Sequence, residues 1–133
     1  IPDCVDEGRV LSVDNQQAID WKRDPRVQSG FKDQLYVQGH VSVVYPPRSS
    51  HEHFAIQIGG DSQDIIEVIY NNSFGRLPQI QVGAEVSACG EYIKSTQTNG
   101  GYPPSPAGHI IHWVHKILAS SQGALVMTMA SSS

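Results

Sequence analysis

The stretch from Leu35 to Tyr45 constrains the fold more than any other part of the sequence, because apolar and polar residues alternate along it. The apolar set is Leu35, Val37, Val41, Val43 and Tyr45, with Gly39 in the same phase, and the polar set is Gln38, His40 and Ser42. Successive side chains of a strand point to opposite faces, so this pattern predicts a β-strand with one buried face. Gly39 suits a bulge or a tight bend. We expect Pro46-Pro47 to end the strand.

Further segments with apolar residues between turn residues predict more strands. They cover residues 53–58, 64–70, 86–92 and 108–117, and residues 124–127 suggest one added edge strand. The turn at Gly59-Gly60-Asp61 predicts that the first two of these form a hairpin. The loop Ser95–Gly108 contains three Pro and three Gly, which excludes regular structure there.

Five strands with a glycine inside the first are typical of an OB-fold, a five-stranded Greek-key barrel. We therefore predict a mainly β protein with a short helix that starts at Asn15 as its cap and stops at Asp24-Pro25. The expected organisation is an N-terminal extension over residues 1–33, the barrel over residues 34–118 and a C-terminal tail over residues 119–133. An immunoglobulin-like sandwich is the rival fold, but it needs about seven strands.

Composition restricts the partners. The net charge is −4 with nine Lys and Arg among 133 residues, which disfavours nucleic acid because phosphate binding needs gathered basic groups. No apolar run reaches the roughly 18 residues of a membrane span. The start at Ile1, without Met, is what removal of a signal peptide leaves, and a trimmed sequence would look the same. We predict a periplasmic or secreted protein.

The two cysteines, Cys4 and Cys89, are too far apart for a redox or zinc Cys-x-x-Cys motif. In an oxidising compartment they could form a disulfide that ties the N-terminus to the predicted strand at residues 86–92. The alternative is two unrelated thiols, with Cys89 packed as a small apolar residue. We predict the disulfide.

The segment Val82–Tyr92 reads V-G-A-E-V-S-A-C-G-E-Y, and after a Gly-containing loop Ile111–His115 reads I-H-W-V-H. This pattern resembles a family of small, mostly secreted bacterial OB-fold proteins that is catalogued as a domain of unknown function. The resemblance covers roughly residues 38–116. It implies a barrel and export, and it supplies no catalytic residues. The sequence departs from the pattern in its longer Pro-rich loop and in lacking Asp-Pro after His115.

Three histidines lie close together in the sequence and suggest a metal site: His109, His112 and His115. On a strand, however, His112 faces away from the other two, so the three cannot share one ion. Zinc bound by His112 or His115 together with His40, His51 or His53 stays possible, but rings bonded to backbone or to Glu91 are the simpler interpretation. The sequence carries no hydrolase or phosphate-binding motif, and we expect neither metal nor cofactor.

We predict a non-enzymatic binding module with a cleft on the barrel face under the loop Ser95–Gly108. Trp113 is either a core aromatic or a platform on which bases or sugar rings stack. The ligand would be an oligosaccharide, a peptide or a short oligonucleotide. The alternatives are a hydrolase or nuclease that uses histidine-bound metal, and an interaction domain of the cell envelope. The predicted ligand-binding residues are His40, Glu91, Tyr92, Tyr102, His112, Trp113 and His115.

Overall fold

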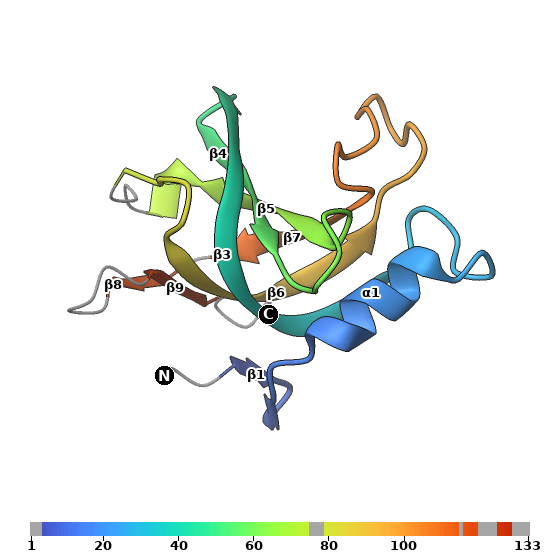
Figure 1. The fold of residues 1–133 in the computed structure, drawn as a ribbon, viewed down its shortest axis with the longest axis horizontal. Helices are drawn as coiled ribbons and strands as arrows, with labels where there is room; N and C mark the ends of the chain where they lie inside the picture. Colours follow the sequence, from blue (N-terminus) through green and yellow to red (C-terminus); the bar gives the residue numbers. More distant parts are fainter. Residues whose placement is uncertain (1–3, 75–78, 115, 120–124, 129–133) are drawn as a thin grey trace.

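The protein is mainly β, and the described residues include one short α-helix (Figure 1). The computed structural model describes residues 4–74, 79–114, 116–119 and 125–128. Its elements are β1 (Cys4–Asp6), β2 (Arg9–Leu11), α1 (Asn15–Arg23), β3 (Lys32–Arg48), β4 (His51–Gln57), β5 (Ile65–Asn71), a 3₁₀ turn (Asn72–Phe74), β6 (Glu85–Lys94), β7 (His109–Val114), β8 (Lys116–Ala119) and β9 (Leu125–Thr128). The helix is neither long nor apolar enough to cross a membrane.

The main sheet has the strand order β3-β4-β5-β7-β6-β9-β8, and β3 also pairs with β6. The five strands β3, β4, β5, β7 and β6 are therefore paired in a cycle. All neighbours in this cycle are antiparallel except β5 and β7, which run parallel. The first half of the long strand β3 pairs with β6, and its second half pairs with β4. His40 belongs to both pairings.

Gly39 lies where β3 changes partner. A Cβ atom at this position would overlap the backbone carbonyl of Gln57 on β4. The close approach of the two backbones therefore requires glycine, as expected for a strand that bends sharply. The bulge itself comes two residues later, where the pairing with β4 shifts between Val41 and Val43.

Because of this bulge, the prediction that the alternate residues from Leu35 to Tyr45 all point to one face was wrong. Leu35, Val37 and Val41 are buried in the core, but Val43 and Tyr45 are only half-buried. Beyond the bulge they pair with Ala55 and His53 of β4, which lie on the outer face. A one-residue slip moves every following side chain to the other face, so Tyr45 points away from the core.

Three other predictions about strand ends were wrong. Strand β3 continues through Pro46-Pro47 to Arg48, because a second register break between Tyr45 and Arg48 leaves the prolines without a required ladder bond. Strand β7 ends at Val114 rather than at residue 117. The added strand β9 is not at the edge, since it pairs with β6 on one side and β8 on the other.

Helix α1 forms where it was predicted, but Asp14 caps it rather than Asn15. The Asp14 carboxylate accepts a hydrogen bond from the Gln17 backbone N–H, 3.0 Å away. Asn15 instead exchanges two hydrogen bonds with the backbone of Gln38 and so fastens the helix to β3. The helix buries Ala18 and Ile19 against the core, which supplies its apolar stripe.

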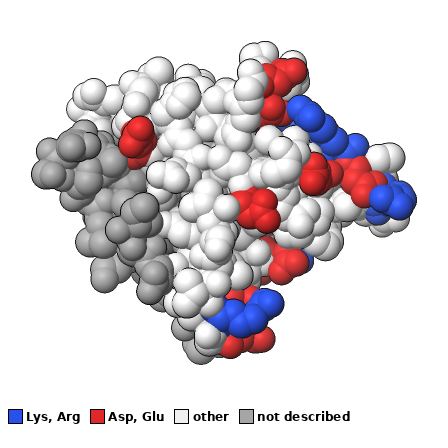
Figure 2. Space-filling model, turned by 60° about the horizontal axis from the view of Figure 1, so that its bottom comes forward, with Lys and Arg blue, Asp and Glu red and all other residues white. Residues whose placement is uncertain are grey.

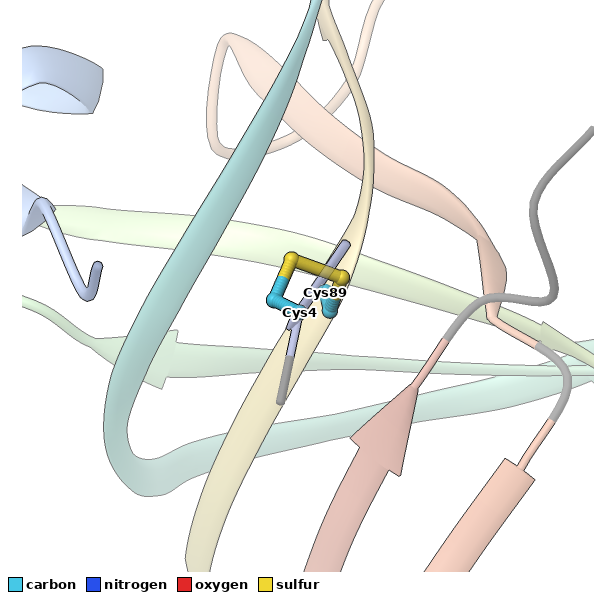
Figure 3. The surroundings of a disulfide bond; sticks show 2 residues. All are labelled: Cys4 and Cys89. Atoms are coloured by element: carbon cyan, nitrogen blue, oxygen red, sulfur yellow. A yellow bond between two sulfur atoms is a disulfide. The ribbon is translucent and has the colours of Figure 1, made fainter. Parts of the chain in front are cut away.

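The predicted disulfide is confirmed. It joins Cys4 of β1 to Cys89 of β6, with the Cα atoms 5.6 Å apart (Figure 3). Both cysteines are buried, and they pack with Tyr36 and Leu11 in a small cluster separate from the main core. The bond holds the short β1–β2 hairpin against the outer face of β6.

Candidate functional site

Glu91 and His112 form the part of the predicted site that the structure brings together. They are direct partners across the β6–β7 ladder, and the His112 Nε2–H donates to Glu91 Oε1 over 2.7 Å. Both side chains lie on the outer face and are mostly buried. Burial lowers the pKa of His112, while the hydrogen bond and the charge of Glu91 act in the opposite direction.

Tyr92 does not line a surface cleft, which corrects its predicted place. It points into the core, where it has no exposed surface and packs against Trp21 and Phe31. Its hydroxyl donates to His109 Nδ1 at 2.9 Å, and His109 Nε2–H donates to the Ile65 carbonyl at 2.7 Å. Burial raises the pKa of Tyr92 and lowers that of His109 to about 4.

The remaining predicted residues do not join the Glu91–His112 pair in the described structure. His40 is exposed and sits six residues further along β3 than Gln34, the residue that pairs with Glu91. That is about 20 Å of extended strand. Tyr102 is 75% exposed on the β6–β7 loop. The side chain of Trp113 and all of His115 lie outside the described residues.

A second group on the outer face was not predicted as a site. Glu67 of β5 is only 6% exposed, and its two carboxylate oxygens accept hydrogen bonds from His53 Nδ1 and Ser105 Oγ, both at 2.8 Å. Tyr45 is close enough for the charge of Glu67, after burial, to raise the pKa of its hydroxyl. We call Tyr45, His53, Glu67 and Ser105 the Glu67 cluster.

One sequence signal could have indicated this cluster. Glu67 interrupts the apolar run I-I-E-V-I, and a carboxylate in a buried strand requires partners. Its outward phase follows from Ile66 and Val68, which are both buried in the core. Ser105 could not be found in the same way, because its approach depends on how the long β6–β7 loop folds back over β5.

The Glu67 cluster and the Glu91–His112 pair lie on adjoining strands of one face. Glu67 pairs with Ile110, two residues before His112 on β7. One strand spacing and two residues of rise place the Glu67 and His112 Cα atoms about 8 Å apart. In both groups a carboxylate fixes the orientation of an imidazole ring: Glu67 that of His53, and Glu91 that of His112. Such groups can accept and donate hydrogen bonds to a ligand without a large net charge.

Among the described residues, no three His, Cys, Asp or Glu side chains converge as a metal site. Comparison with known families finds no family model that matches the sequence, and no curated protein matches it significantly.

Proposed function

We propose that the protein is an exported, non-enzymatic binding module with an OB-fold, and that it binds an oligosaccharide across the outer face of β4, β5 and β7. Membership in the OB-fold family that the G-E-Y and I-H-W-V-H segments resemble is part of this proposal. The observation that carries it is the presence of two carboxylate–histidine pairs about 8 Å apart on one face.

The cyclic strand pairing supports the OB-fold. OB-folds bind ligands on their second and third strands, between the loops that join strands one and two and strands four and five. When β3 is counted as the first strand, that face consists of β4 and β5. The flanking loops are the Ser49-Ser50 turn and the β6–β7 loop. The Glu67 cluster occupies this face, and Ser105 comes from the second of these loops.

Charge favours a neutral ligand over a nucleic acid. The net charge is −4, and the carboxylates of the outer face would repel phosphates. On the face shown in Figure 2, Lys and Arg groups lie beside Asp and Glu groups rather than gathering into a basic patch. Sugar hydroxyls suit paired imidazole and carboxylate groups, because each hydroxyl both donates and accepts.

The disulfide supports export. Structural disulfides persist in oxidising compartments and are rare in the cytosol. The Cys4–Cys89 bond is buried and joins segments 85 residues apart. A periplasmic or extracellular location would place the protein where oligosaccharides of the cell surface occur.

NMR titration tests the proposal. We expect cellotetraose, chitotetraose or maltotetraose to shift the amide signals of Ile69, Ser105 and His112 saturably, and an oligothymidylate to leave them unchanged. Glu67→Gln removes a charged acceptor and should weaken binding at least about tenfold. Glu85→Gln is the matched control, because it changes the same charge at an exposed position on β6.

Three results would contradict the proposal. They are binding of the oligonucleotide in preference to all three sugars, hydrolysis of the bound sugar, and the absence of saturable shifts with every sugar. Equal weakening by Glu67→Gln and Glu85→Gln would also reject the outer face as the site.

A further inference from the structure

A cavity of about 520 Å³ lies between the segment that follows α1 and the start of the β6–β7 loop, and none of its lining residues belongs to the Glu67 cluster. Two lysines line it, Lys22 of α1 and Lys94 at the end of β6, together with polar side chains that include Gln28, Thr96 and Gln97. None of the described residues that line it is an Asp or a Glu. Its volume is within the range of pockets that bind small molecules.

Hydrogen bonds fix the walls of this cavity. Ser29 Oγ accepts from the backbone N–H groups of Thr96 and Gln97, at 3.0 and 3.2 Å. Gly30 N–H donates to the Lys94 carbonyl at 2.7 Å, and Lys94 N–H donates to the Phe31 carbonyl at 3.0 Å. These bonds join the two segments through the consecutive residues Ser29, Gly30 and Phe31, so they fix the position of one wall relative to the other.

The two lysines contact uncharged groups rather than carboxylates. Lys94 is only 5% exposed, and its Nζ donates to the carbonyls of Trp21 and Asp24 at the end of α1, at 2.9 and 2.8 Å. Lys22 Nζ donates to the Gln63 carbonyl at 2.6 Å. An ammonium group has three donors. Within the described residues, one donor of Lys94 and two of Lys22 are therefore left for another acceptor.

Two of the nearby carboxylates are paired with arginines. Asp24 binds Arg26, and Asp64 binds Arg23 at 2.7 Å. Asp61 and Asp64 act on Lys22 only at a distance, and burial outweighs them and lowers the pKa of Lys22. A charge that is removed from water without a counter-ion is costly. An anion in the cavity would relieve that cost.

We propose that this cavity binds a small hydroxylated anion, a sugar acid or a sugar phosphate. The two ammonium groups would hold the anionic group, and the Gln and Thr side chains would bind hydroxyls. Lysine acts as a point charge without the planar fork of arginine, so both carboxylate and phosphate suit it. The inference does not depend on the outer-face proposal.

Isothermal titration with glucuronate, glucose 6-phosphate and glucose tests it. We expect saturable binding of one or both anions, weakened by salt, and no binding of glucose. Binding of glucuronate alone, of glucose 6-phosphate alone or of both identifies the anionic group. Lys22→Gln should weaken binding about tenfold or more. Lys32→Gln, which removes the same charge at an exposed position on β3, should leave it within about twofold.

A second variant covers the case in which a lysine substitution disturbs the fold. Gln97→Glu places a carboxylate in the cavity, and it should abolish anion binding while raising the melting temperature by a few degrees. Glucose binding as strong as glucuronate binding, unchanged binding in Lys22→Gln, or no saturable heat with either anion would overturn the proposal.

Discussion

The histidines on the two faces of the β6–β7 ladder have hydrogen-bond partners of opposite kinds, neutral on one face and charged on the other. His109 and His112 lie three residues apart on β7, so they point to opposite sides of the sheet. Within the part of the chain that the structure describes, the ring nitrogens of the inner residue, His109, bond to the neutral Tyr92 hydroxyl and the Ile65 carbonyl. The outer residue, His112, bonds to the Glu91 carboxylate. The inner ring is therefore built to stay neutral, whereas the outer ring has a partner that favours its charge.

Under the proposed function, this difference assigns the inner face to stability and the outer pair to ligand recognition. A buried neutral ring with both nitrogens bonded contributes to packing and leaves no group for a ligand. A ring held by a carboxylate at a partly exposed position is oriented by it and stays accessible to a ligand. We therefore expect changes at the inner face to appear in unfolding experiments, and changes at the outer pair to appear mainly in binding and in titration of the histidine itself.

The largest expected loss of stability follows from removing the disulfide, which holds the β1–β2 hairpin against the outer face of β6. Replacing both Cys4 and Cys89 by Ser removes a cross-link between residues 85 positions apart. The chain-entropy model gives about 4.6 kcal/mol as an upper figure, and we expect close to 4 kcal/mol in urea unfolding. The reduced wild-type protein is the control. A loss below about 1 kcal/mol would show that the β1–β2 hairpin is dispensable.

The inner face should lose stability in acid. Unfolding returns His109 from a pKa of about 4 to its ordinary value near 6.5. Between these values the unfolded chain binds a proton that the folded protein does not, so stability falls as the pH falls from 6.5 to 4. The loss should be about 3 kcal/mol. His109→Gln should be less stable at pH 7 but should lack this part of the acid dependence.

Urea unfolding of both proteins at several pH values measures this difference. Carboxylates that titrate in the same range contribute equally to both and cancel. Parallel pH profiles for the wild type and His109→Gln would mean that folding does not lower the pKa of His109, and the contrast between the two faces would fail.

The sequence predicted most of the fold because period-two alternation and turn residues are local signals. They placed α1, the β4–β5 hairpin, the inward phase of Leu35 to Val41 and the strand that contains Cys89. The sequence did not predict the bulge after Val41, because nothing local indicates that one extra residue is accommodated there. That single slip moved Tyr45 to the outer face.

The candidate site was harder to predict for the same reason. Glu91 and His112 could be paired from sequence because β6 and β7 are consecutive strands. The Glu67 cluster joins β3, β4, β5 and a loop, and its contacts depend on register across several strands. Tyr92 was misplaced because a tyrosine at a strand end suits either the core or a cleft. In the structure it contacts Trp21 and His109, and these contacts hold it in the core.

The smallest expected effect on stability concerns the Glu91–His112 pair. His112→Gln should cost less than about 1 kcal/mol at pH 7, since a partly exposed pair of this kind contributes little to stability. The informative measurement is the pKa of His112, followed by NMR through its ring C–H signal. In the wild type, Glu91 opposes the lowering caused by burial. Glu91→Gln removes the charge and keeps the shape, so burial then acts with less opposition and the pKa of His112 should fall further.

The direction of this shift distinguishes the two faces, because among the described residues the ring of His109 bonds to a hydroxyl and a carbonyl rather than to a carboxylate. The pKa of His109 should therefore stay near 4 in Glu91→Gln, and only the His112 signal should titrate at lower pH. A rise in the pKa of His112 would mean that water, not Glu91, stabilises its charge. The ring would then be a solvated group, and the outer pair would lose its fixed orientation toward a ligand.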